Sequence, residues 1–181
     1  MTDAPFPGFP YHPDPRGTGS VVESDYRCVA CGLARGYIYT GPAYSTEELD
    51  EALCPWCVAD GSAAQKFDAH FTDFGSEVTD DVTRSVIEQL DRRTPGFTSW
   101  QGGHLLYHCG DGAVFLGVVG RKELDPYPDA IEVLRHEHDE DGWEPDEVEE
   151  YLAALDKDGQ PTAYLFRCRT CGCHLAYSDE T

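Results

Sequence analysis

The sequence is short of basic residues and has no long apolar run. Only 13 Lys and Arg stand against 34 Asp and Glu in 181 residues, and the formal net charge at pH 7 is −21. A surface this acidic repels nucleic acid and anionic lipid, so we expect neither as a partner. No apolar run is long enough to cross a bilayer, and we therefore expect no membrane association.

The first twenty residues lack the features of a secretory signal. They have no basic stretch followed by an apolar one and are instead rich in Pro and Gly. We therefore expect a cytoplasmic protein, in which thiols stay reduced. Segment 1–20 is predicted to be an extended arm, because Tyr11-His12-Pro13-Asp14-Pro15 disfavours helix before each proline. Residues 21–181 are then sufficient for a single globular domain.

The acidic residues are unevenly distributed along the chain. From Glu137 to Glu150 there are nine acidic side chains and no Lys or Arg. Such a segment attracts a basic protein over long range, and we predict that Glu144, Glu147 and Glu150 contact this partner. The simpler explanation is that the charge only keeps the protein soluble.

Paired cysteines are the feature that the sequence has in unusual number. Six of its eight cysteines form three Cys-x-x-Cys pairs, Cys28/Cys31, Cys54/Cys57 and Cys168/Cys171. The first and third pairs share the phrase Arg-Cys-x-x-Cys-Gly. Such a turn places two thiolates at the separation that a tetrahedral Zn²⁺ requires, and the glycine allows the chain to close it. In a reducing compartment these pairs are predicted to bind metal rather than to form disulfides.

The first two pairs have the spacing of one structural zinc site. The 22 residues between Cys31 and Cys54 leave room for a strand and a short helix, so Cys28, Cys31, Cys54 and Cys57 are predicted to share one ion. A rival arrangement joins the two Arg-Cys-x-x-Cys-Gly phrases and leaves Cys54-Pro55-Trp56-Cys57 as a redox motif. A redox motif of this type needs a preceding strand and a doubly wound fold, which the pattern does not predict.

The third pair requires two further ligands. We favour His108 and Cys109, because a site closed by a distant segment constrains the fold most strongly. Together with Cys168 and Cys171 they would form a second zinc site. The alternative ligands are His104, Cys173 and His174.

Two other interpretations of this second site remain. In one, the pair Cys168/Cys171 is incomplete and Cys109 is a small buried apolar residue. In the other, only Cys109, Cys168 and Cys171 bind zinc, and the open position holds a water, which would make the protein a zinc-dependent enzyme. Asp111 could then orient that water, although it more simply begins a Gly110-Asp111-Gly112 turn.

The hydrophobic pattern predicts an α+β fold. Small antiparallel β-ribbons resembling zinc ribbons carry the cysteine pairs, and helices are inserted between them. Strands are expected at 36–41, 104–109, 113–117, 161–167 and 174–178. Helices are expected at 46–53, 62–71, 80–93, 129–138 and 145–156.

Several phrases resemble the CbrC-like proteins of bacteria. They include Tyr11-His12-Pro13-Asp14-Pro15, Leu53-Cys54-Pro55-Trp56-Cys57 and His108-Cys109-Gly110-Asp111, and the resemblance covers nearly the whole chain. It implies a small bacterial cytoplasmic protein without a settled activity, loosely associated with tolerance of DNase-type colicins. Such a toxin is basic where it meets DNA, which suits a partner of charge −21.

The sequence as a whole predicts a zinc-stabilised binding protein without enzymatic activity. Its acidic surface would engage a basic protein partner, in a role related to colicin tolerance or stress. A zinc-dependent enzyme is the alternative.

Overall fold

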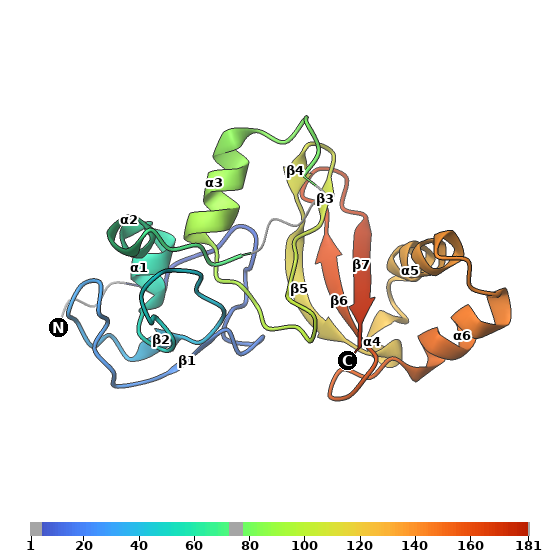
Figure 1. Cartoon of the computed structure of the whole chain (residues 1–181), viewed down its shortest axis with the longest axis horizontal. Coiled ribbons are helices and arrows are strands. Elements are labelled where there is room, and N and C mark those ends of the chain that lie inside the picture. The colour runs from blue at the N-terminus through green and yellow to red at the C-terminus, as the bar shows by residue number, and fades with distance from the viewer. Residues whose placement is uncertain (1–4, 73–77, 181) are drawn as a thin grey trace.

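Short antiparallel strands and six helices make up the computed structural model, which describes residues 5–72 and 78–180 (Figure 1). The strands form two two-stranded ribbons and one three-stranded sheet. The mixed α+β character predicted from the sequence is confirmed. None of the helices within the described ranges combines the length and apolar character that a membrane span needs.

The N-terminal unit contains the first ribbon and two short helices, at the left of Figure 1. Strand β1 (Val21–Glu23) pairs with β2 (Tyr37–Tyr39), and α1 (Pro55–Ala59) and α2 (Ser62–Phe67) follow. Leu53, Val58 and Phe71 are fully buried beside the strands in one apolar cluster. Elements this short have little intrinsic stability, so the unit depends on this core and on its cysteines.

The helix predicted over 46–53 is wrong. This segment forms turns, and Glu51 has a positive φ of 50°. Its backbone is used by neighbouring segments: Tyr39 N donates to Leu53 O (2.8 Å), and Val29 N donates to Ala52 O (2.9 Å). These long-range hydrogen bonds outweigh the local helix signal, which is a weak one in any sequence.

A three-stranded sheet forms the middle of the molecule. Its order is β5 (Val114–Val119), β6 (Thr162–Arg167), β7 (His174–Asp179), and both pairings are antiparallel. Along β6, Ala163 and Leu165 enter one apolar cluster, whereas Tyr164 and Phe166 enter another on the opposite face. The central strand is therefore buried on both faces.

Different parts of the chain cover the two faces of this sheet. Helices α4 (Arg121–Leu124), α5 (Pro128–Glu140) and α6 (Pro145–Ala154) pack on one face, at the right of Figure 1. Leu90 of α3 (Arg84–Arg93) and Phe97 pack on the other. Helix α3 begins four residues later than predicted, and α4 was not predicted. The helices expected at 129–138 and 145–156 are confirmed within a few residues.

A tight hairpin stands near one end of the sheet. Strand β3 (Tyr107–His108) pairs with β4 (Asp111–Gly112) around Cys109 and Gly110, whose φ angles are 55° and 72°. Two central residues with positive φ are typical of a two-residue hairpin loop. The turn therefore lies one residue earlier than the predicted Gly110-Asp111-Gly112. The following strand, β5, joins the larger sheet instead of completing this ribbon.

The described part of the predicted arm, residues 5–20, has neither helix nor strand and packs between the N-terminal unit and the sheet. Phe9 and Tyr11 are buried, and Tyr11 O accepts a hydrogen bond from Phe115 N (2.9 Å). His12 is also buried, with Nδ1 2.7 Å from Pro95 O and Nε2 2.7 Å from the Thr18 hydroxyl. Because a carbonyl only accepts, Nδ1 carries the proton, and burial lowers the pKa of His12.

A first prediction concerns Tyr39, which is 1 % exposed. Its hydroxyl donates to Pro42 O (2.6 Å) and accepts from Gly96 N (3.0 Å). Tyr39→Phe removes both hydrogen bonds and is expected to lower the free energy of unfolding by about 1–3 kcal/mol. Urea unfolding followed by circular dichroism measures it. The control is Tyr26→Phe, because Tyr26 is 71 % exposed, and equal stability of the two variants would contradict the role assigned to Tyr39.

Candidate metal centres

The first cysteine cluster consists of Cys28, Cys31, Cys54 and Cys57. Their sulfur atoms all lie within 4.8 Å of one another, and those of Cys31 and Cys54 are 3.9 Å apart. Cys28, Cys54 and Cys57 are buried. This is the set that the sequence spacing predicts. The rival arrangement, in which Cys28 and Cys31 share an ion with Cys168 and Cys171, is not formed, because Cys168 and Cys171 lie in the second cluster.

Two local structures present these four sulfurs. In the loop after β1, Gly32 has a φ of 72° and its N–H donates to Cys28 O (2.7 Å), which closes a knuckle around Cys28 and Cys31. Cys54 is the N-cap residue of α1, with Pro55 at the first helical position, so Cys57 follows almost one turn later. The hydrogen bond from Val29 to Ala52 holds the two halves together.

The electrostatics of the first cluster favour a cation. The Cys54 thiol donates a hydrogen bond to Cys28 and so lowers the pKa of Cys28 to about 4, whereas the same hydrogen bond raises the pKa of Cys54. Burial raises the pKa of Cys57 to about 11. Without a cation, therefore, the hydrogen bond to Cys28 disfavours ionisation of Cys54 and burial disfavours ionisation of Cys57, whereas a divalent metal would stabilise their thiolates.

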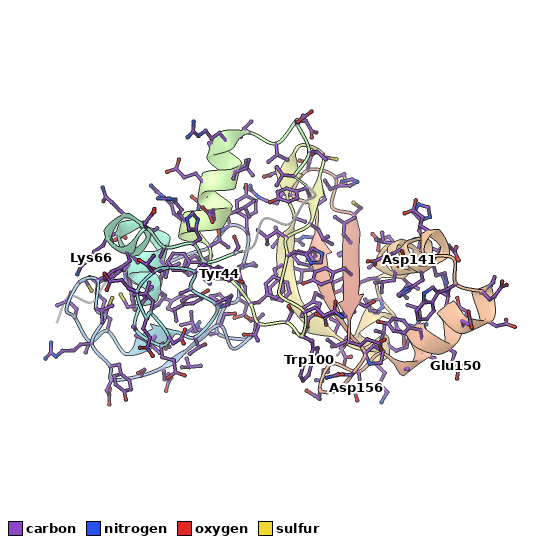
Figure 2. The ribbon with its side chains drawn as sticks, viewed as in Figure 1. Tyr44, Lys66, Trp100, Asp141, Glu150 and Asp156 are labelled. Carbon is purple, nitrogen blue, oxygen red and sulfur yellow. The ribbon has the colours of Figure 1, made fainter. Side chains whose placement is uncertain are left out.

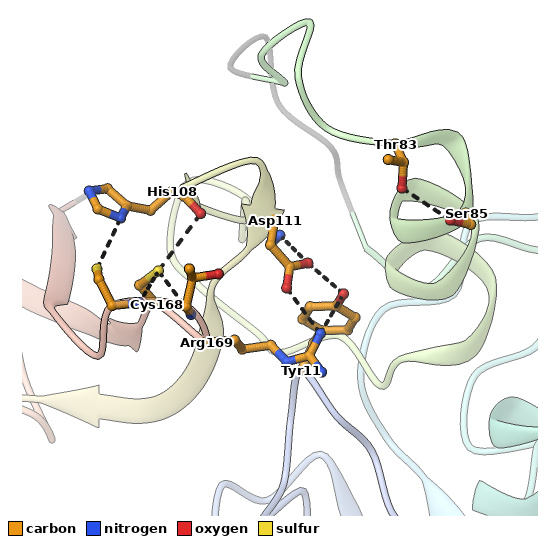
Figure 3. Close-up of polar contacts among 10 residues, drawn as sticks. Tyr11, Thr83, Ser85, His108, Asp111, Cys168 and Arg169 are labelled. Carbon is orange, nitrogen blue, oxygen red and sulfur yellow. Dashed lines mark hydrogen bonds and ion pairs between the residues drawn. The ribbon is translucent and has the colours of Figure 1, made fainter.

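The second cluster contains His108, Cys168, Cys171 and Cys173, whose ligand atoms also lie within 4.8 Å of one another. The sulfurs of Cys171 and Cys173 are 3.2 Å apart, and His108 Nδ1 is 3.5 Å from Cys171 Sγ and 3.6 Å from Cys173 Sγ. Figure 3 shows the Cys168 sulfur, in the loop after β6, pointing at the backbone carbonyl of His108 in the hairpin, 3.8 Å away. Only Cys168 is buried in this cluster.

Cys109 is a fifth donor beside this second cluster. Its Sγ lies 3.2 Å from His108 Nδ1, although it is not one of the four atoms that are mutually within 4.8 Å. Desolvation of its sulfur, together with the Cys171 and Cys168 thiols, raises the pKa of Cys109 to about 11. All eight metal ligands predicted from the sequence thus lie in or beside the two clusters.

Cys173 is the residue that sequence reasoning undervalued. The two knuckles make the same backbone contacts: Gly172 N donates to Cys168 O (3.1 Å), and Cys168 N donates to Cys173 O (2.8 Å). In the first knuckle, Leu33 O accepts the corresponding bond from Cys28 N (3.0 Å). Aligning the two phrases therefore places Cys173 opposite Leu33, a comparison that would have identified it as part of the knuckle.

Backbone N–H groups also prepare the second cluster for a cation. Burial opposes ionisation of Cys168, but the N–H groups of Cys171 and Thr170 point at its sulfur and lower the pKa of Cys168 to about 6. The other histidines considered as ligands have different contacts. His174 is bound to the Asp129 carboxylate (Nδ1–Oδ2 3.2 Å), and His104 stacks on Tyr177.

Asp111 is engaged in a network of its own (Figure 3). Its carboxylate accepts hydrogen bonds from the Tyr11 hydroxyl (2.6 Å) and from Arg169 Nη1 (3.0 Å), and Arg169 also lies over the Tyr11 ring. Desolvation and the Asp111 carboxylate raise the pKa of Tyr11 to about 12. The network joins the arm, the hairpin and the second knuckle, so the Asp111 carboxylate has a structural role.

The predicted partner residues Glu144, Glu147 and Glu150 lie on or beside α6, away from both clusters. Glu144 and Glu147 form a capping box at the start of the helix, in which Glu144 N donates to Glu147 Oε2 (3.1 Å). Figure 2 shows Glu150 on α6, at the opposite end of the molecule from Lys66 in the N-terminal unit. Two of these three acids thus also have a local structural role.

Comparison with known proteins gives a family without an assigned activity. Residues 6–180 match the family described as "Uncharacterised protein family (UPF0167)". The chain is 54 % identical over 178 residues to UPF0167 protein Mb2317 of Mycobacterium bovis, covering 98 % of this chain and 95 % of that protein. It is 39 % identical to UPF0167 protein PA1536 of Pseudomonas aeruginosa, covering 93 % of each.

No solved structure matches the chain significantly. Neither the family nor these two relatives carry the CbrC name, so that resemblance and the colicin role stay predictions. The extent of the family match and the identity to the relatives lead to one conclusion: the chain belongs to the uncharacterised UPF0167 family.

Proposed function

We propose that this protein is a zinc-stabilised, non-enzymatic binding protein of the cytoplasm. We further propose that its acidic end, by which we mean the segment from Glu137 to Glu150, engages a basic protein partner. The observation that carries the proposal is the number of donors at the second cluster. Five side chains converge there, His108, Cys109, Cys168, Cys171 and Cys173. A tetrahedral Zn²⁺ uses four, so no position need be left for a water.

The donor chemistry supports zinc as the ion in both clusters. Four sulfurs, or three sulfurs and an imidazole nitrogen, are the ligand sets of structural zinc sites. Softer thiolate donors also suit Zn²⁺ better than Mg²⁺ or Ca²⁺, which prefer oxygen ligands. When bound, zinc would neutralise the thiolates and hold segments that are far apart in the sequence.

The alternative, an enzyme with an open site at Cys109, Cys168 and Cys171, has less support. His108 and Cys173 add two donors to that site, and the nearby carboxylate, Asp111, is already bound by Tyr11 and Arg169. A catalytic zinc needs both an open position and a group that can activate its water.

The acidic end of the molecule supports the choice of a basic partner. On α5, Arg135 is bound within the protein, to Glu132 and Glu149. Glu150 is exposed on α6 next to this pair. A basic protein surface, such as the DNA-binding face of a nuclease toxin, would be attracted to this end and would bind less tightly as salt screens the charges.

A second prediction concerns the metal content. The purified chain is expected to contain two zinc ions by native mass spectrometry, and Co²⁺ substitution should give thiolate charge-transfer absorption. Cys54→Ser is expected to remove one ion and to unfold the N-terminal unit, because binding energy in such sites is folding energy. One or no ion in the wild-type chain would contradict the two-site proposal.

A third prediction separates the donors of the second cluster. Cys109→Ser and Cys173→Ser are each expected to keep two zinc ions, because four donors remain. The double variant leaves His108, Cys168 and Cys171, and its second site is expected to bind zinc at least about tenfold more weakly, by analogy with the loss of other site-tuning groups. Competition with a chromophoric chelator measures this affinity. Loss of an ion from either single variant would show that this cysteine is an indispensable ligand.

A fourth prediction tests the acidic end with the nuclease domain of a DNase-type colicin as the probe. Isothermal titration calorimetry is expected to detect binding that weakens between low and physiological salt. Glu150→Lys should lower the affinity about tenfold, as expected for a close interfacial charge pair. Glu88→Lys on α3 makes the same charge change at another exposed position and should have little effect. Absence of binding at low salt would remove the support for this partner.

A further inference from the structure

A surface pocket of about 530 Å³ lies beside α6, where aromatic rings and carboxylates meet. The residues that matter for its chemistry are Trp143, Tyr151, Pro161, Glu147, Glu150 and Glu180. None of the described residues that line it is Lys or Arg. We propose that this pocket binds the guanidinium group of an arginine side chain on a basic protein, an inference that rests on the function proposed above.

The backbone at the end of α5 fixes one aromatic wall. Gly142 has a φ of 85°, and its N–H donates to Asp139 O (3.1 Å), while Trp143 N donates to His138 O (3.1 Å). These two hydrogen bonds make the glycine-terminated helix end in which the residue after the glycine folds back on the last turn. Trp143 is therefore held against the helix, yet 37 % of its surface stays exposed.

Tyr151 supplies the second wall. Its hydroxyl lies 3.2 Å from the Ser178 hydroxyl, which holds the ring in place against the sheet. The Trp143 and Tyr151 rings are 5.5 Å apart between centroids and nearly perpendicular, at 76°. The two rings therefore pack edge-to-face, and an aromatic face left open in such a pair attracts a cation through its quadrupole, most strongly when the ring belongs to Trp.

His138 packs behind both rings, with centroids 4.9 Å from Trp143 and 4.5 Å from Tyr151. It is 9 % exposed, and neither ring nitrogen has a hydrogen-bond partner among the described residues. Burial lowers the pKa of His138 below its ordinary value, so the ring is neutral at pH 7. The wall behind the aromatic rings therefore places no positive charge against an arriving cation.

The carboxylates complete the pocket and face it from two elements. Glu147 already accepts from Glu144 N in the helix cap. The side chains of Glu150, on α6, and Glu180, just after β7, make no hydrogen bond or ion pair within the described residues, and both are exposed. They are the two carboxylates that an incoming cation can meet without breaking an existing contact.

Arginine suits this combination better than lysine. Its guanidinium is planar, so it can stack on an aromatic ring while its N–H groups donate to carboxylates in a fixed fork. The methylene stem of the same side chain would rest on Pro161 and on the ring edges. The acidic end would thus recognise a basic partner through an arginine side chain bound in this pocket.

The test uses the ¹⁵N-labelled, zinc-loaded full chain titrated with arginine amide at low salt. The readout is the indole N–H resonance of Trp143, assigned by its absence from the Trp143→Phe spectrum. We expect a saturable shift with arginine amide and none with citrulline amide, which has the same shape without the charge. Glu150→Gln should weaken the apparent affinity at least threefold, and the matched Glu88→Gln on α3 should leave it unchanged.

The pocket assignment is overturned if arginine amide gives no saturable shift, if citrulline amide shifts the resonance equally, or if Glu150→Gln has no effect. The outcome is separable from that of the proposed function. A basic protein that binds through Glu150 while arginine amide does not shift Trp143 would overturn the pocket alone. Binding of arginine amide without binding of a basic protein would support the pocket and count against the proposed function.

Discussion

Four cysteine sulfurs within 4.8 Å of one another repel as thiolates, and the structure of the N-terminal unit depends on how that repulsion is relieved. A shared proton between Cys28 and Cys54 relieves it partly, and a divalent cation would relieve it fully. The sulfurs come from the knuckle after β1 and from the start of α1. The same two segments are joined by the hydrogen bonds from Val29 to Ala52 and from Tyr39 to Leu53, which also place the apolar core around Leu53. These two hydrogen bonds and the sulfur cluster therefore stabilise the same arrangement of the chain.

The second cluster has the same local design but a different place in the fold. It joins the β3–β4 hairpin to the loop between β6 and β7, and the Tyr11–Asp111–Arg169 network ties the arm to the same corner. The first cluster is mostly buried, whereas the second has one buried cysteine. The two knuckles thus make the same backbone hydrogen bonds, but the first belongs to a mostly buried cluster and the second to a cluster near the surface.

The sequence predicted the helices and the metal cluster that depend on neighbouring residues. It missed the features that depend on contacts between distant segments. Pro145, the acidic first turn and the apolar stripe identified α6, and the cysteine spacing identified the first cluster. The segment 46–53 failed because Tyr39 and Val29 use its backbone for long-range hydrogen bonds. Aligning the two phrases places Cys173 in the knuckle, opposite Leu33, but its closeness to His108 depends on the hairpin, a distant segment whose position the sequence pattern did not predict.

The contact between the arm and β5 has a consequence for the sheet as a whole. A three-stranded sheet has two outer strands, and an uncovered outer strand offers its free N–H and C=O groups to any other extended chain. The carbonyl of Tyr11 accepts from Phe115 on the outer side of β5, while α5 lies against β7. The proline-rich start of the chain therefore covers part of the β5 edge, because it occupies the outward N–H of Phe115.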